Sequence, residues 1–98
     1  MPKPHAEPVD AQGVARCLAA YGLDHLRARK YGSFVIVESG PQEDPIPHAR
    51  LRRDTVHLWT LEVATHTGRW KKTGFRDLRD KLITLLVTTL PWIVAPRE

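Results

Sequence analysis

The sequence has a single cysteine, Cys17, so no disulfide can form within the chain and nothing points to an oxidising compartment. It also lacks a long apolar run. The most apolar stretch, Leu82 to Ala95, is interrupted by Pro91 and is shorter than the roughly 20 residues that a membrane-spanning helix needs. Residues 1–9 are polar and proline-rich, without the apolar segment of a secretory signal. We therefore expect a cytoplasmic protein that does not enter a membrane.

Metal and catalytic motifs are absent as well. Structural zinc sites usually place two ligands at short spacing, such as C-x2–4-C or H-x3–5-H, and none of the five histidines forms such a pair. The chain has no glycine-rich phosphate loop. Cys17 lies on the apolar stripe of a predicted helix, which favours a buried structural thiol over a nucleophile. We therefore expect no enzymatic activity, no metal, no cofactor and no small-molecule substrate.

What the sequence does contain fits one small domain. Its 98 residues fall within the roughly 50 to 200 of an independently folded unit, and its 42% of hydrophobic residues can form a core. The prolines within residues 1–9 indicate a flexible N-terminal arm. We expect a single α+β domain over residues 10–95 and a short tail over residues 96–98.

The first predicted helix covers about Ala11 to Tyr21. Asp10 is a suitable N-cap, because its carboxylate can accept the free backbone N–H groups of the first turn. Gly22 supplies the left-handed residue that often follows a helix. Apolar residues recur at i, i+3, i+4 and i+7 and form one stripe: Val14, Cys17, Leu18 and Tyr21.

The apolar period then changes from 3.6 to 2, which indicates strands. His25 to Lys30 and Ser33 to Glu38 form a predicted hairpin around Tyr31-Gly32, while a helix over Asp24 to Lys30 stays an alternative. Residues 39–47 are rich in proline and form a predicted loop.

Three more strands are predicted over His48 to Arg53, Val56 to Thr65 and Arg69 to Lys72. Turns at Asp54-Thr55 and His66-Thr67-Gly68 join them. Alternation along these strands assigns the following residues to an inner face: Ala49, Leu51, Trp59, Leu61, Val63 and Trp70. The residues that alternate with them, His48 and Ala64 included, are assigned to the outer face.

An amphipathic stripe predicts a C-terminal helix that has Thr73 as its N-cap and ends at Pro91. The residues of this stripe are Phe75, Leu78, Leu82, Leu85, Leu86, Thr89 and Leu90. Trp92 to Val94 is expected to fold back over the core. The fold class is therefore α+β, an antiparallel meander of four to five strands with an N-terminal and a C-terminal helix packed on one face. The expected core cluster is Trp59, Leu61, Val63, Trp70, Phe75, Leu78, Leu82 and Leu86.

Basic residues are the main functional signal. The net charge of +4 permits binding to phosphate without requiring it. In a meander, six cations would project from the face opposite the tryptophans and form a phosphate-binding surface: Arg27, Arg29, Arg50, Arg52, Arg69 and Lys71. Alternatively, these arginines only keep an open face soluble and block edge-to-edge pairing. Glu62 and Glu38 would dilute the positive charge there.

The order of a helix, a three-stranded meander and a second helix resembles the double-stranded RNA-binding domain. Gly40-Pro41 followed by His48 is similar to the G-P-x-H loop of that family, and Lys71-Lys72 to the K-K-x-A-K motif that opens its last helix. The chain departs from the pattern where Gly74 and Phe75 replace an Ala and a Lys and where a proline-rich insertion displaces His48. We do not assign the chain to this family.

Our interpretation is a small non-enzymatic binding domain whose open sheet face takes nucleic-acid phosphate without sequence preference. The alternative is a protein-interaction module or accessory subunit, self-associating or not, that has no nucleic-acid ligand. The sequence leaves the choice between DNA and RNA open.

Overall fold

A computed structural model describes residues 4–96 of the chain. The elements follow one another in this order: α1 (Pro8–Ala20), β1 (Arg27–Tyr31), β2 (Phe34–Ser39), β3 (Ile46–Arg53), β4 (Trp59–Ala64), β5 (Trp70–Asp77) and α2 (Arg79–Thr89). The strands form one five-stranded antiparallel sheet in the order β1-β2-β3-β4-β5, so that each strand pairs with its neighbours in the chain.

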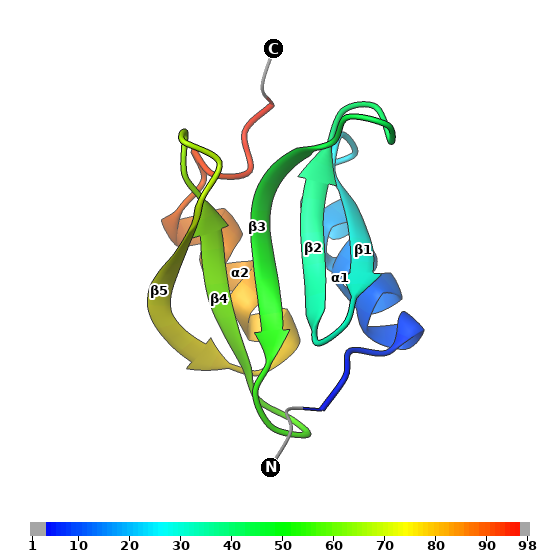
Figure 1. Cartoon of the computed structure of the whole chain (residues 1–98), viewed down its shortest axis with the longest axis vertical. Helices are drawn as coiled ribbons and strands as arrows, with labels where there is room; N and C mark the ends of the chain where they lie inside the picture. The colour runs from blue at the N-terminus through cyan, green and yellow to red at the C-terminus, as the bar shows by residue number, and fades with distance from the viewer. Residues whose placement is uncertain (1–3, 97–98) are drawn as a thin grey trace.

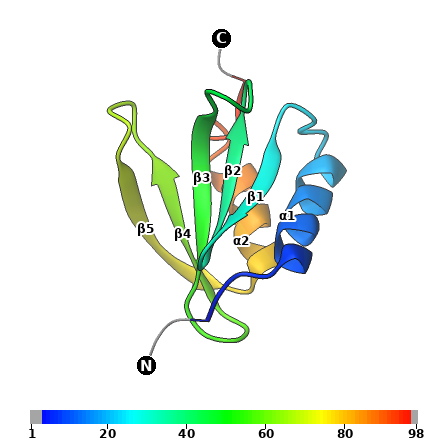
Figure 2. The same ribbon diagram turned by 45° about the vertical axis from the view of Figure 1, so that its right-hand side comes forward.

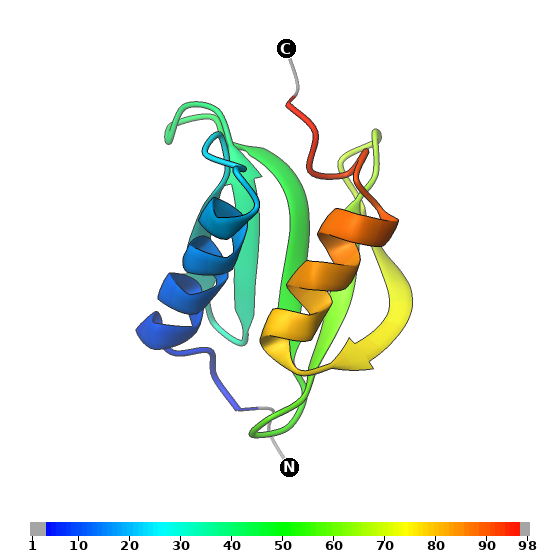
Figure 3. The same cartoon turned by 180° about the vertical axis from the view of Figure 1, so that it is seen from behind.

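Both helices cover the same face of the sheet. The sheet lies in front of them in Figure 1 and behind them in Figure 3. α1 packs on β1 and β2, and α2 packs on β4 and β5. The β1 edge lies beside α1, whereas β5 forms the opposite edge, away from that helix (Figure 2). The predicted α+β meander with both helices on one face is confirmed.

The core lies between the sheet and the helices. It combines inward side chains of the central strands with the inner stripes of both helices and with the C-terminal segment, and its fully buried members include Val14, Leu18, Val35, Val37, Leu51, Leu61, Leu82, Ile83 and Leu86. Of the predicted core, Trp59, Leu61, Leu82 and Leu86 belong to it and Val63 packs against it. Ile93 and Val94 are buried as expected, whereas Trp92 is 64% exposed.

α1 begins at Pro8, three residues before the predicted start, and its N-cap is Glu7, not Asp10. Asp10 instead reaches back from the first turn, and its Oδ2 accepts the backbone N–H of Glu7 at 2.8 Å. Ala6 is buried, and its N–H donates to the carbonyl of Gly32. Residues 6–9, which were predicted to lie in a flexible arm, therefore fold with the domain. Residues 1–3 lie outside the described residues.

The hairpin of β1 and β2 is confirmed, with Tyr31 opposite Phe34. The alternative of a helix over residues 24–30 is wrong, because Arg27 to Lys30 pair with β2. Gly32 provides the turn with a φ of 58°, in the left-handed region that glycine adopts without strain.

The boundary between β5 and α2 differs most from the prediction. β5 continues to Asp77, and α2 begins at Arg79 with Leu78 as its N-cap, so Thr73 is a strand residue. Thr73 donates its hydroxyl hydrogen to the carbonyl of Leu61 at 2.8 Å. Phe75 and Leu78, which were predicted to open the helical stripe, are 38% and 45% exposed. Arg76 and Asp77 pair with β4, and the N–H of Phe75 donates to the hydroxyl oxygen of Thr73. The apolar stripe of α2 starts only at Leu82.

His48 was predicted to face outward, and this is wrong. Val37 pairs with Ala49 and Glu38 pairs with Pro47, so His48 is the extra residue of a β-bulge. An extra residue changes the parity of the strand and can turn a side chain to the other face. The His48 side chain is fully buried. Its Nδ1–H donates to the carbonyl of Ile93 at 2.7 Å, and its Nε2 lies 2.7 Å from the hydroxyl of Ser39.

Candidate functional site

The face of the sheet away from the helices is the candidate site. Directly opposite residues in antiparallel strands point to the same side, so the pairing of β1 to β5 defines which residues share this face. We call it the open face, and its members are Arg27, Arg29, Tyr31, Phe34, Ile36, Glu38, Pro47, Arg50, Arg52, Thr60, Glu62, Ala64, Trp70, Lys72 and Arg76.

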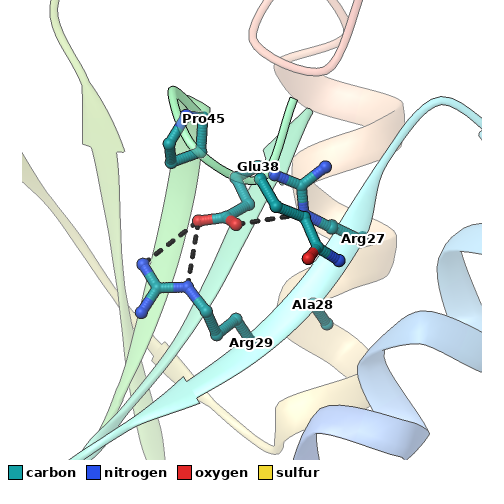
Figure 4. Close-up of a pocket in the computed structure, with 6 residues that line it drawn as sticks. Arg27, Ala28, Arg29, Glu38 and Pro45 are labelled. Carbon is teal, nitrogen blue, oxygen red and sulfur yellow. Dashed lines mark hydrogen bonds and ion pairs between the residues drawn. The ribbon is translucent and has the colours of Figure 1, made fainter. Parts of the chain in front are cut away.

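At one end of the open face, a buried carboxylate holds two arginines (Figure 4). Glu38 is 3% exposed. Its Oε2 accepts from Nε of Arg27 at 3.1 Å, and its Oε1 accepts from Nε and Nη2 of Arg29 at 3.2 and 3.1 Å. The Arg27 guanidinium also donates to the carbonyl of Gly40. Pro45 and Gln42 complete the wall of a hollow of about 510 Å³ beside these groups.

A second buried carboxylate lies at the centre of the face. Glu62 is 4% exposed, and its Oε1 accepts from Nη2 and Nε of Arg50 at 2.8 and 3.1 Å. The Arg50 guanidinium carbon is 4.1 Å from the ring centroid of Phe34 and 4.5 Å from that of Trp70. A guanidinium stacks well on aromatic rings because it is planar and weakly hydrated. Arg50 therefore covers Glu62 and connects an aromatic ring of β2 with one of β5.

The remaining cations of the open face, Arg52, Lys72 and Arg76, form no ion pair with Glu38 or Glu62 within residues 4–96. Arg76 donates from Nε to Oδ2 of Asp54 at 2.7 Å. Arg52 lies opposite Phe34 and Thr60, and Lys72 lies opposite Glu62. Among residues 4–96, these two form no ion pair. With Arg76 they line a hollow of about 320 Å³ between β4 and β5.

Only part of the predicted cation set shares the face. Arg27, Arg29, Arg50 and Arg52 do so, and three of these four bind the buried carboxylates. Arg69 belongs to the exposed turn before β5. Lys71 lies opposite Val63, on the helix side of the sheet edge, so its predicted position is wrong. The predicted dilution of the charge by Glu38 and Glu62 is confirmed by these ion pairs.

Trp70 was assigned to the wrong face, and the sequence held the signal that would have placed it. A turn at residues 66–68 puts Thr65 and Arg69 across from one another, so Ala64 and Trp70 must pair and share a face. Ala64 was predicted on the outer face. The same parity brings Lys72 onto that face, and the continued pairing of β5 with β4 adds Arg76.

The thiol of Cys17 is half-buried on α1. Burial raises its pKa, and the neighbouring Asp80 carboxylate raises it further through its charge and a hydrogen bond, while Arg79 and Arg16 act in the opposite direction. Since a thiolate is the reactive form of cysteine, a raised pKa makes the thiol less nucleophilic at neutral pH.

We expect Cys17 to react more slowly with a thiol reagent in the native protein than after denaturation at pH 7, and the native rate to rise as pH approaches the raised pKa. Asp80→Asn should speed native labelling, because it removes a negative charge that disfavours the thiolate. Glu43→Gln, in the loop before β3, is the matched control. Native labelling as fast as denatured labelling would contradict a structural role and favour a nucleophile.

Within residues 4–96, no three His, Cys, Asp or Glu side chains gather as a metal-binding group, and no helix is both long and apolar enough to cross a bilayer. The residues that resemble the double-stranded RNA-binding domain are placed unlike its motifs. Lys71 and Lys72 lie in β5 and not in a helix, and His48 is buried.

Comparisons of the chain with protein-family models, with curated proteins and with solved structures found no match. The open face must therefore be interpreted from its own geometry and chemistry.

Proposed function

We propose that this chain is a small, non-enzymatic cytoplasmic domain that binds nucleic-acid phosphate groups with the open face of its sheet. The observation that supports this is the concentration of cations on the face that the helices leave uncovered. Strands β1, β3 and β5 contribute them, as Arg27, Arg29, Arg50, Arg52, Lys72 and Arg76. The carboxylates on the same face are Glu38 of β2 and Glu62 of β4, and both are buried.

The buried carboxylates orient the arginines as well as neutralising part of their charge. The Glu38 carboxylate accepts hydrogen bonds from Nε of Arg27 and from Nε and Nη2 of Arg29. The Glu62 carboxylate accepts hydrogen bonds from Nε and Nη2 of Arg50. A guanidinium has five N–H donors, so each arginine keeps donors that a phosphate oxygen can accept. An arginine already held in one rotamer loses less side-chain entropy on binding.

Phosphate contacts fix a protein on a nucleic acid without reporting its sequence. Arg52 and Lys72, which have no carboxylate partner among residues 4–96, are the strongest candidates for these contacts. We therefore expect sequence-tolerant binding that weakens as salt increases.

Titration with fluorescently labelled DNA and RNA at low salt tests the proposal. For about four phosphate contacts, the plot of log affinity against log salt should have a slope of about −3 to −4. Arg52→Glu combined with Lys72→Glu should weaken binding at least about tenfold for every sequence and reduce the slope by about 2, because phosphate contacts are lost.

The matched control is Arg16→Glu with Lys81→Glu. It makes the same change in net charge on exposed positions of α1 and α2, the helices on the other face of the sheet. If both double variants lose affinity equally, net charge and not the open face governs binding. No binding to any nucleic acid at tens of micromolar protein would overturn the proposal.

The alternative function, self-association or binding of another protein, is favoured by a different surface. Trp92 is 64% and Phe75 is 38% exposed, and with Leu90 they line a groove of about 340 Å³ beside β5. β5 is also an edge strand, which can pair with another chain. Lys71, Lys72 and Arg76 on that strand work against such pairing, so we place this function second.

A further inference from the structure

The open face contains aromatic rings that phosphate binding alone does not explain. Tyr31 and Phe34 are direct partners in the hairpin of β1 and β2, so their side chains are adjacent on this face. Trp70 joins them from β5, since the guanidinium of Arg50 lies over both its ring and that of Phe34. The core cluster of the described residues contains none of these three rings.

The rings alternate with guanidinium groups across the sheet. The guanidinium carbon of Arg29 lies 5.8 Å from the ring centroid of Tyr31. The guanidinium carbon of Arg50 lies 4.1 Å from the centroid of Phe34 and 4.5 Å from that of Trp70. Tyr31 is 64% exposed, and Phe34 and Trp70 are half-buried. Large rings at a sheet surface, next to cations that are fixed by buried carboxylates, can stack with bases. The guanidinium of Arg50 already lies over Phe34 and Trp70, so bases would stack on Tyr31 and on the ring faces that Arg50 leaves uncovered.

The geometry points to single-stranded nucleic acid as the ligand of the open face, with bases stacked on Tyr31, Phe34 and Trp70 and phosphates held by Arg52 and Lys72. This inference rests on the proposed function and makes it more specific. Arg52 lies directly opposite Phe34 in the sheet, so a cation is next to an aromatic ring. One nucleotide could therefore stack its base on the ring while its phosphate contacts the cation. Every base has an apolar π-face, so stacking is tolerant of sequence.

A duplex fits this face less well. Its bases are stacked on one another and cannot reach the rings, so only phosphate attraction would remain. Glu38 and Glu62 reduce that attraction, because they pair with three of the arginines. Both helices cover the other face of the sheet, so neither can enter a major groove from this side (Figure 3).

The experiment compares 12-nucleotide oligo(dT) and oligo(U) with 12-base-pair DNA and RNA duplexes by fluorescence anisotropy. We expect the single strands to bind at least about tenfold more tightly. Trp70→Leu should weaken single-strand binding by about 5- to 150-fold and leave duplex binding unchanged, since it removes one stacking surface. Trp92→Leu is the matched control, because Trp92 is exposed beside Leu90 and Ile93 and lies off the open face.

Tyr31→Leu provides a second ring variant at a more exposed position, in case Trp70→Leu affects folding, which circular dichroism would detect. A Trp92→Phe background adds a spectroscopic readout. It leaves Trp59, which is 3% exposed, and Trp70, so a stacked base should quench the emission of Trp70.

Equal affinity for single strands and duplexes, with no loss in either ring variant, would overturn this inference. If Arg52→Glu with Lys72→Glu still weakened binding in that case, the proposed function would stand. No binding to any of the four ligands would overturn both.

Discussion

Leu82→Ala should lower the free energy of unfolding by about 2–5 kcal/mol, the range for removing a fully buried leucine. Leu82 is 0% exposed and packs in the core between α2 and the sheet. Deleting its branched side chain removes apolar contacts and leaves a cavity that the surrounding side chains fill only partly. Urea denaturation followed by circular dichroism measures the effect, and the slope against urea should stay unchanged.

Phe75→Ala is the matched control. The sequence pattern put Phe75 and Leu82 on one helical stripe, whereas the structure places Phe75 in β5 with 38% of its surface exposed. We expect Phe75→Ala to cost less than about 1 kcal/mol, as surface substitutions usually do. Equal costs for the two variants would mean that Phe75 is a core residue and that the assigned end of β5 is wrong.

The second large effect concerns His48. His48→Leu roughly keeps the side-chain volume but removes both hydrogen bonds, so the carbonyl of Ile93 and the hydroxyl of Ser39 each lose a buried partner. Each unpaired buried group costs about 1–3 kcal/mol, so we expect a total loss of about 2–5 kcal/mol in urea denaturation. His57→Leu, in the exposed loop before β4, should change stability by less than about 0.5 kcal/mol.

Hydrogen exchange gives a local readout of the same variant. The N–H groups of Ile93 and Val94 donate to the carbonyls of Leu90 and Pro91 in the turn after α2. If His48 holds this segment in place, His48→Leu should raise the exchange rates at residues 93 and 94 more than in β4. Unchanged exchange at both residues would show that the segment is held by other contacts.

The sequence predicted the elements of this fold better than it predicted their faces. The period of 2 located the strands, and the stripe through Leu82 and Leu86 located α2, because burial of one face is a strong and local constraint. The predicted start of the C-terminal helix was wrong, because Phe75 and Leu78 continue the apolar spacing of α2 by coincidence. Arg76 and Asp77 pair with β4, which makes this segment a strand. The spacing of apolar residues along the chain contains no information on such pairing.

The candidate site was predicted less well, because membership of a face depends on parity and one extra residue reverses it. The bulge at His48 supplies such an extra residue. Trp70 was misplaced for another reason, because its apolar character outweighed the parity that the turn at residues 66–68 imposes. The arginines on β1 and β3 were placed correctly, since β1 pairs without a bulge and Arg50 and Arg52 both lie after the bulge at His48. The burial of Glu38 and Glu62 against them follows from tertiary packing, which no local pattern encodes.

The order of the strands also bears on how fast the chain can fold. Since neighbours in the sheet are neighbours in the chain, each pairing closes only a short loop, and the entropy lost in closing a loop grows with its length. The contacts that join distant segments lie at the two ends of the chain. Asp10 binds Arg79 and His25 binds the carbonyl of Val94, each across a separation of 69 residues. Proteins rich in local contacts fold faster than those dominated by non-local pairings, so we expect the strand order to favour fast folding, with the contacts between the two end segments the most costly in loop-closure entropy.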